Sequence, residues 1–246
     1  MPVAHRRTRD GNGRLPVLGK ESLALAAASA PIRVWDIPVR LFHWSLVALL
    51  GFSWWSAEIR EMAWHMWSGL ALCALVVFRL IWGFIGSSTA RFGQFLKGPR
   101  ATLAYLTSAE PWRGTGHNPI GGWSVVALLF LLENQIITGL FAVDIDGIES
   151  GPLSYLVDFD QGRVSSGIHE ANFNVLLALS AVHIVAVAAY FFLKRRNLVR
   201  PMMTGITTDV TADPARALVP APMWRLGVAV TLSGLFTYAI AHGFQF

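Results

Sequence analysis

The segment G-I-H-E-A-N-F-N-V-L-L-A-L-S-A-V-H-I-V-A-V-A-A-Y-F-F-L, residues 167–193, decides the fold class. It is long enough to cross the roughly 30 Å of a bilayer's hydrocarbon as an α-helix. His169 and His183 stand fourteen positions apart in it, which is about 21 Å of helical rise and about 40° from a whole number of turns. Both imidazoles therefore point the same way at two depths. Because imidazole in hydrocarbon needs a partner, the pair indicates two stacked cofactors, with haem the first candidate.

The whole chain has the composition of a membrane protein. Its 246 residues are 54% hydrophobic and 14% charged, with a mean hydropathy of +0.48, whereas soluble domains are about 25% charged. Four more apolar runs, residues 39–57, 62–85, 119–142 and 223–242, are each near or above the roughly 20 residues of a spanning helix. The sequence predicts an all-α integral membrane bundle with five spans, since barrel strands would alternate in shorter segments.

The net charge of +5 is distributed as a topology signal. Basic residues gather before the first span, between the second and third, and after the fourth, whereas the loop between the third and fourth is acidic. That loop carries Asp144, Asp146, Glu149, Asp158 and Asp160 against Arg163. The positive-inside rule places the N-terminus in the cytoplasm, the acidic loop outside and, after five spans, the C-terminus in the periplasm. We therefore expect lipid and not nucleic acid as the partner of the basic residues.

The first 31 residues and the single cysteine bear on two questions: whether the chain begins with a signal peptide, and whether a haem could be attached covalently. Arg6 and Arg7 precede a short apolar stretch, but a polar segment separates them, so we favour a basic cytoplasmic tail over a cleaved signal peptide. Cys73 lies inside the second span, and the chain has no C-x-x-C-H motif for covalent haem attachment. Any haem is therefore expected to be held without a thioether bond, as b-type haem.

Two further histidines match the first pair in depth. His43 lies near the cytoplasmic face of the first span and His65 near the outer face of the second, which pairs His43 with His183 and His65 with His169. A haem with two histidine ligands carries electrons, because no axial position is open. A zinc site is the competing metal interpretation, but His169 and His183 are too far apart to share one ion. A proton relay is also open, although it gives no reason for pairing at two depths.

At these residues the sequence resembles the bacterial cytochrome b561 family, which includes the cytochrome b subunits of nickel-iron hydrogenases. The motifs that carry the resemblance span residues 32–205 in order: V-W-D-I-P-V-R-L-F-H-W (34–44), F-R-L-I-W-G-F-I-G (78–86), A-R-F (90–92), G-H-N-P-I-G-G (116–122), T-G-L-F (138–141), G-P-L (151–153), H-E (169–170) and N-L-V-R-P-M-M-T-G (197–205).

The resemblance implies a four-helix, two-haem cytochrome of the bacterial inner membrane that moves electrons between quinone and a partner protein. It implies the same four axial ligands, His43, His65, His169 and His183. The chain departs from the family pattern in its fifth span and its long basic tail.

Other polar residues near the spans have two interpretations each. Arg79 and Arg40 at the cytoplasmic side can bind a haem propionate or extend to lipid headgroups, and we favour the second for Arg40. His117 can bond a propionate or serve a quinone, and the G-H-N-P turn also predicts a helix start at Asn118 and Pro119. Within the third span, Asn134 and Gln135 are expected to bond between helices, with Glu133 left open. Most of the ten tryptophans are expected at the interfaces.

The sequence thus predicts three regions: a basic tail (1–31), a four-helix di-haem domain (32–205), and a polar linker with a fifth spanning helix (206–246). The predicted function is electron transfer in a respiratory chain. Electrons would pass between the quinone pool and a periplasmic c-type cytochrome, hydrogenase or dehydrogenase subunit, with the chain a subunit and not an enzyme by itself. The first alternative is a quinone-linked oxidoreductase acting on a small reductant such as superoxide. The second is an anchor or transporter, for which the sequence shows no inverted repeat.

Overall fold

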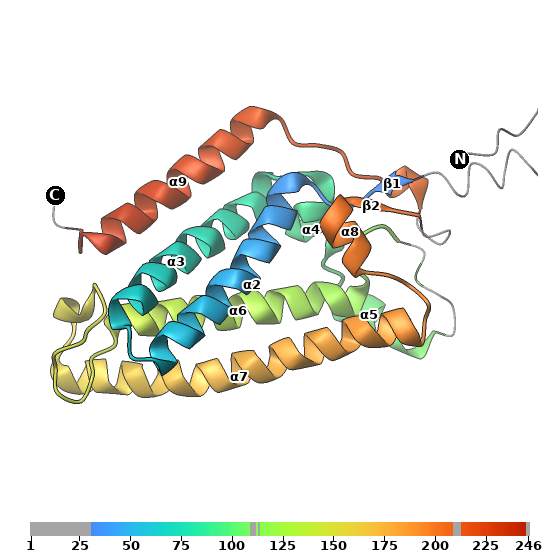
Figure 1. The fold of residues 1–246 in the computed structure, drawn as a ribbon. Helices are drawn as coiled ribbons and strands as arrows, with labels where there is room; N and C mark the ends of the chain where they lie inside the picture. The colour runs from blue at the N-terminus through green and yellow to red at the C-terminus, as the bar shows by residue number, and fades with distance from the viewer. Residues whose placement is uncertain (1–30, 109–111, 113, 209–212, 245–246) are drawn as a thin grey trace, which may run out of the picture.

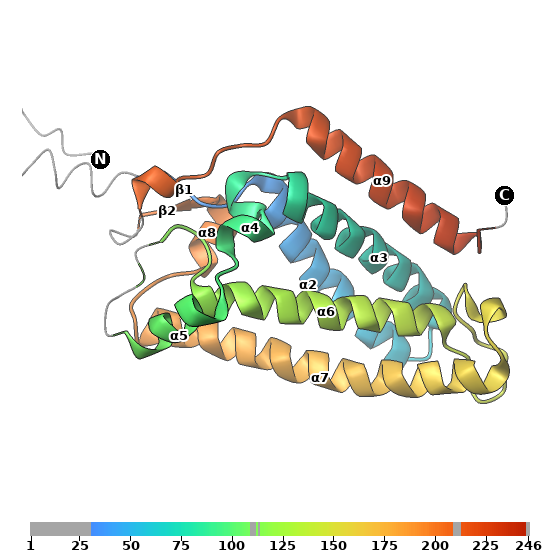
Figure 2. The same ribbon diagram turned by 180° about the vertical axis from the view of Figure 1, so that it is seen from behind.

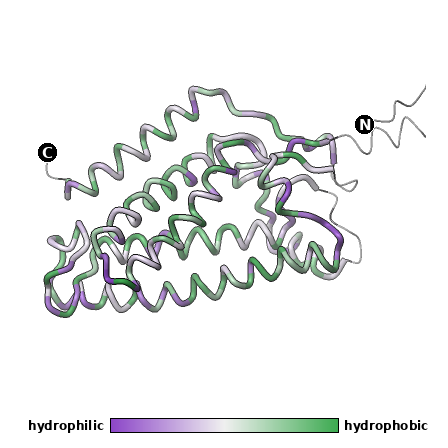
Figure 3. Tube along the Cα trace, in the orientation of Figure 1, coloured by the Kyte–Doolittle hydropathy of each residue, from purple (hydrophilic) through white to green (hydrophobic). Residues whose placement is uncertain are grey.

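The computed structural model describes residues 31–108, 112, 114–208 and 213–244. Apart from Pro31, the predicted basic tail lies outside the described residues. Among the described residues, five helices are long and apolar enough to cross a membrane. They are α2 (Ile37–Glu58), α3 (Met62–Ile85), α6 (Pro119–Phe141), α7 (Phe159–Phe192) and α9 (Met223–Ala241). The five predicted spans are therefore confirmed, and Figure 3 shows the hydrophobic residues concentrated along these helices.

The spanning helices form two antiparallel hairpins and one added helix (Figures 1 and 2). The α2–α3 hairpin meets the α6–α7 hairpin mainly through α3 and α6, and α2 makes little direct contact with α7. The last helix, α9, packs along α3 on the outside of the bundle. The two ends of the bundle differ in charge. We call the end where α2 and α6 begin the basic end, and the end that holds the α6–α7 loop, residues 142–158, the acidic end.

Side-chain caps fix where three of these helices begin. Asp36 accepts a hydrogen bond from Val39 N at the start of α2, and Asn118 accepts one from Gly121 N at the start of α6, as the G-H-N-P motif predicts. The helix α7 starts at Phe159, eight residues before the predicted span. Its start is a capping box in which Asp158 and Gln161 bond each other's backbone N–H groups. This box satisfies the first turn of α7 without requiring apolar residues there.

Short elements complete the two ends of the bundle. The acidic end has the short 3-10 helix η2 (Ser154–Leu156). The remaining short helices and strands are β1 (Ile32–Arg33), η1 (Ser88–Ala90), α4 (Phe92–Phe95), α5 (Pro99–Thr107), α8 (Val199–Thr204), β2 (Ile206–Thr207) and η3 (Pro214–Arg216). The two strands pair antiparallel, with Ile32 opposite Thr207.

The described part of the predicted polar linker is hydrogen-bonded to the bundle. Leu218 N donates to Arg33 O at 2.9 Å, and Ser88 N donates to Val219 O at 3.0 Å. Because these bonds join the linker to the chain on either side of α2 and α3, they fix where α9 begins. The linker therefore holds α9 against α3 and is not a free tether.

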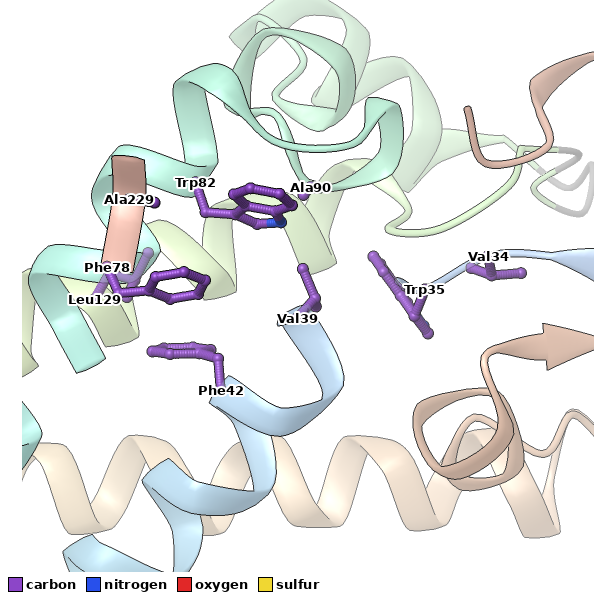
Figure 4. Close-up of a cluster of buried hydrophobic side chains, with 9 residues drawn as sticks. All are labelled: Val34, Trp35, Val39, Phe42, Phe78, Trp82, Ala90, Leu129 and Ala229. Atoms are coloured by element: carbon purple, nitrogen blue, oxygen red, sulfur yellow. The ribbon is translucent and has the colours of Figure 1, made fainter. Parts of the chain in front are cut away.

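A buried apolar cluster lies at the basic end, where α2, α3 and α9 come together (Figure 4). Its members are Val34, Trp35, Val39, Phe42, Phe78, Trp82, Ala90, Leu129 and Ala229. Trp82 is only 2% exposed, and its Nε1 donates to Asp36 Oδ2 at 3.0 Å. Trp35 is likewise buried, at 9% exposed. Trp82 can be buried because Asp36 satisfies its only polar atom.

Candidate functional site

At the acidic end, one histidine from each hairpin meets the other. His65 of α3 and His169 of α7 have ring centroids 6.0 Å apart with nearly perpendicular planes. A metal–imidazole bond is about 2 Å long and the ring centre lies about 1 Å behind the nitrogen, so two imidazoles on opposite sides of one metal ion have centroids about 6 Å apart. The structure thus brings His65 and His169 close together, at a separation that two ligands on opposite sides of one metal ion would have.

Each of these two rings is oriented by the first helix of its own hairpin. His65 Nδ1 donates to Ser53 O of α2 at 2.9 Å, and His169 Nδ1 donates to Gln135 O of α6 at 2.9 Å. Because a carbonyl oxygen only accepts, Nδ1 carries the proton on both rings. Each Nε2 therefore keeps its lone pair, which is the tautomer that a metal-bound histidine needs.

Small and hydroxyl residues surround this pair. Ser53 Oγ lies 3.2 Å from His65 Nδ1, and Thr138 Oγ1 lies 3.4 Å from His169 Nδ1. A Cβ on Gly139 would lie 2.8 Å from His169 Cε1, which is closer than carbon atoms pack. The imidazole of His169 therefore occupies space that only glycine leaves open at position 139.

The second predicted pair lies toward the basic end, with His43 on α2 and His183 on α7. Both side chains are partly buried. Unlike the pair at the acidic end, His43 has a buried Nδ1 with no hydrogen-bond partner among the described residues. An unpaired buried nitrogen is costly, so His43 has a polar atom that no described side chain satisfies.

Arg79 of α3 is part of this arrangement. It is 3% exposed, which excludes the interpretation that its side chain extends to lipid headgroups. Its Cζ lies 5.0 Å from the Phe92 ring centroid, and its buried NH1 has no hydrogen-bond partner among the described residues. A buried guanidinium with a free N–H group is suited to bind an anion.

His117 lies beside Arg79, just before α6 begins. Its ring is 4.7 Å from that of Trp35 and 4.8 Å from that of Phe95 by centroids. Burial lowers the pKa of His117 to about 3, and the nearby Arg79, His183 and His43 add to the effect. The imidazole is therefore neutral at pH 7, and its buried Nδ1 has no partner among the described residues.

Each end of the bundle fits a haem in one respect. Haem needs axial nitrogens with free lone pairs, which the tautomers of His65 and His169 provide. Its two propionates are anions that need buried donors, and Arg79 offers an unpaired N–H group close to His117. Each unpaired atom is one that a bound anionic or polar group would satisfy.

The remaining predicted residues have structural partners. Arg40 NH1 donates to Met203 O at 2.6 Å, which joins α2 to α8. Asn134 Nδ2 donates to Asn172 Oδ1 at 2.9 Å, and Asn172 Nδ2 donates to Gln135 Oε1 at 2.6 Å. The predicted bonding between helices is thus confirmed for Asn134 and Gln135.

Sequence reasoning missed Ser53 and Asn172, which support the ligands without being ligands. Both are polar residues within apolar spans. Ser53 is close in space to His65, and Asn172 is close in sequence to His169. Ser53 accepts from His65, and Asn172 lies one turn along α7 from His169. For Asn172, a polar residue within a span was the signal that could have found it. Ser53 accepts through its backbone oxygen, for which the sequence carries no signal.

Comparison with known proteins agrees with the resemblance drawn from the motifs. Residues 34–205 match the family model described as prokaryotic cytochrome b561. No curated protein and no solved structure matches the chain.

Proposed function

The chain belongs to the prokaryotic cytochrome b561 family, and from this premise we propose that it holds two b haems and carries electrons across a bacterial inner membrane. The family implies b-type haem and electron transfer. We further propose that the electrons pass between the quinone pool and a redox protein on the periplasmic side, with the chain acting as a subunit of a respiratory system.

The observation that carries the proposal is the geometry of His65 and His169. Their rings lie 6.0 Å apart, and each donates its Nδ1 proton to a carbonyl of the preceding helix. We assign these two residues as the ligands at the acidic end and His43 with His183 as the ligands at the basic end. Bound haem would supply one-electron chemistry, while the chain binds it, orients it and tunes it. The two sites would stand about 21 Å apart along α7.

We assign Arg79 and His117 to the propionates at the basic end. Arg79 offers its buried NH1. His117 is neutral at pH 7, so its Nδ1 can donate in one tautomer without adding a second buried charge beside Arg79. These roles need only a donor in each case, and a quinone carbonyl near this end would be recognised by the same chemistry.

The charge of the two ends supports the partner assignment. By the positive-inside rule the acidic end faces the periplasm, and its loop carries Asp144, Asp146 and Glu149, with Asp158 and Asp160 where α7 begins. This surface attracts a basic redox protein and increases its association rate. It repels a small anion such as superoxide, so we favour a protein partner over the self-contained oxidoreductase.

The test of this function is the haem content of the purified protein in detergent. Dithionite should produce a b-type spectrum with two haems per chain. Replacing either His65 or His43 by Leu should remove one haem and leave the other. His242→Leu is the matched control, since His242 lies beyond α9 and bonds only Tyr238 O at 3.0 Å. A folded but colourless protein, or full haem content in both variants, would refute the assignment.

A further inference from the structure

We propose that Asn172 is a positioning residue that acts through Gln135 to hold the His169 ring and to lower the reduction potential of the acidic-end haem. The inference rests on the proposed function, since it assumes that His65 and His169 bind haem. It concerns a residue that is neither a proposed ligand nor hydrogen-bonded to a ligand ring, so its role must be transmitted by the helix beside it.

Asn172 uses its whole side chain between α6 and α7. It is 7% exposed. Its Nδ2 donates to Leu131 O at 2.9 Å and to Gln135 Oε1 at 2.6 Å, while its Oδ1 accepts from Asn134 Nδ2 at 2.9 Å. Both amide protons and the carbonyl oxygen are therefore bonded to a single face of α6, on successive turns. An amide that is satisfied in this way between membrane helices fixes their register.

Gln135 connects this amide to the ligand. Its side-chain Oε1 accepts from Asn172, and its backbone oxygen accepts from His169 Nδ1. Asn172 and His169 are three residues apart on α7 and so lie on the same face of that helix. Two residues of α7 thus bond one residue of α6. Moving α7 along or around α6 would break both bonds together, so the Asn172 amide holds the ring in place.

The position of the His169 ring affects the reduction potential of the acidic-end haem, because His169 Nδ1 donates to the backbone oxygen of Gln135. A carbonyl that accepts the Nδ1 proton makes the imidazole a stronger electron donor to a bound metal. Stronger donation stabilises the ferric state and lowers the reduction potential. At the basic end, His43 Nδ1 has no such acceptor among the described residues. Only the acidic-end haem should therefore respond to a change at position 172.

The experiment compares Asn172→Leu with Asn174→Leu in the full chain, in detergent with its haems bound. Asn174 is the matched control, because it is an exposed asparagine on the same helix whose side chain bonds only Glu170 O at 3.1 Å. We expect Asn172→Leu to raise the midpoint potential of one haem and leave the other unchanged. The low-spin ferric signal of that haem should also change, since it depends on the orientation of the ligand rings. Asn174→Leu should change neither.

A second variant protects the test against a folding defect in Asn172→Leu. Gln135→Leu keeps the backbone oxygen that accepts from His169 but removes Oε1, so it should raise the same potential by a smaller amount. Unchanged potentials and signals in both variants, with two haems bound, would overturn the role of Asn172 and leave the proposed function intact. If the unaltered protein binds no haem, the proposed function fails first, and this inference fails with it.

Discussion

Gly139→Ala tests the acidic-end site by steric exclusion, without touching a ligand. The new Cβ would lie 2.8 Å from His169 Cε1 and 3.1 Å from its Nδ1. Carbon atoms pack at about 3.5–4.0 Å, so the ring must move by about 0.7 Å or more. The 2.9 Å bond from His169 Nδ1 to Gln135 O then lengthens or bends beyond useful geometry. Disturbing a bond that orients a metal ligand typically weakens metal binding about 10- to 100-fold.

The assay is haem loss to an excess of apomyoglobin, followed by absorbance. In Gly139→Ala one of two haems should leave about 10- to 100-fold faster, and the other should leave at its unaltered rate. Gly69→Ala is the control. Like Gly139, Gly69 is a helical glycine near a proposed ligand, one turn from His65 on α3. Unlike at Gly139, a Cβ at Gly69 meets nothing within 4 Å. That substitution should stabilise the helix by about 0.5–1 kcal/mol and leave both rates unchanged. Equal haem loss from the two alanine variants would refute the assignment of His169 as a ligand.

Three further predictions concern the basic end. Burial lowers the pKa of His117 to about 3, against about 6.5 in the unfolded chain, so the unfolded chain binds more protons between these values. The thermal midpoint should fall as the pH drops from 6.5 toward 3, and His117→Phe should flatten this dependence. Asp36→Ala removes the cap of α2 and the acceptor of Trp82 Nε1, and should lower the free energy of unfolding by about 1–3 kcal/mol in denaturant titrations. Burial and the Tyr190 hydroxyl raise the pKa of Tyr105 to about 12, so Tyr190→Phe should lower that pKa in an alkaline phenolate titration.

The sequence was sufficient for the spans because hydropathy is a local property. It also placed His65 and His169 at the same depth, since the depth of a residue follows from its place in a span, and their rings are 6.0 Å apart. Their role as a ligand pair stays a prediction. The sequence could not predict the start of α7 at Phe159, because residues 159–166 are not apolar enough to enter a hydropathy-based span. The Asp158–Gln161 capping box was the signal for that start.

The supporting residues were harder to predict for a different reason. Which carbonyl accepts from His169 depends on the register between α6 and α7, and no pattern within one helix specifies it. The same holds for Trp82, whose burial depends on Asp36, 46 residues away in sequence. The sequence could therefore indicate that Asn134 and Gln135 bond between helices, but only the structure shows which partners they have.

Each hairpin contains one acidic-end histidine and the residue that accepts its Nδ1 proton, and this has a consequence for how the protein is assembled in the membrane. Ser53 and His65 belong to the first hairpin, and Gln135 and His169 belong to the second. Each half of the bundle thus contains a histidine together with the carbonyl that sets its proton and its direction. The first half can acquire this local order while the ribosome is still making the second. The two halves meet mainly through α3 and α6, so a haem bound between His65 and His169 would add a further link between them. We therefore expect a shortage of haem to leave hairpins that separate more easily and are exposed to membrane proteases.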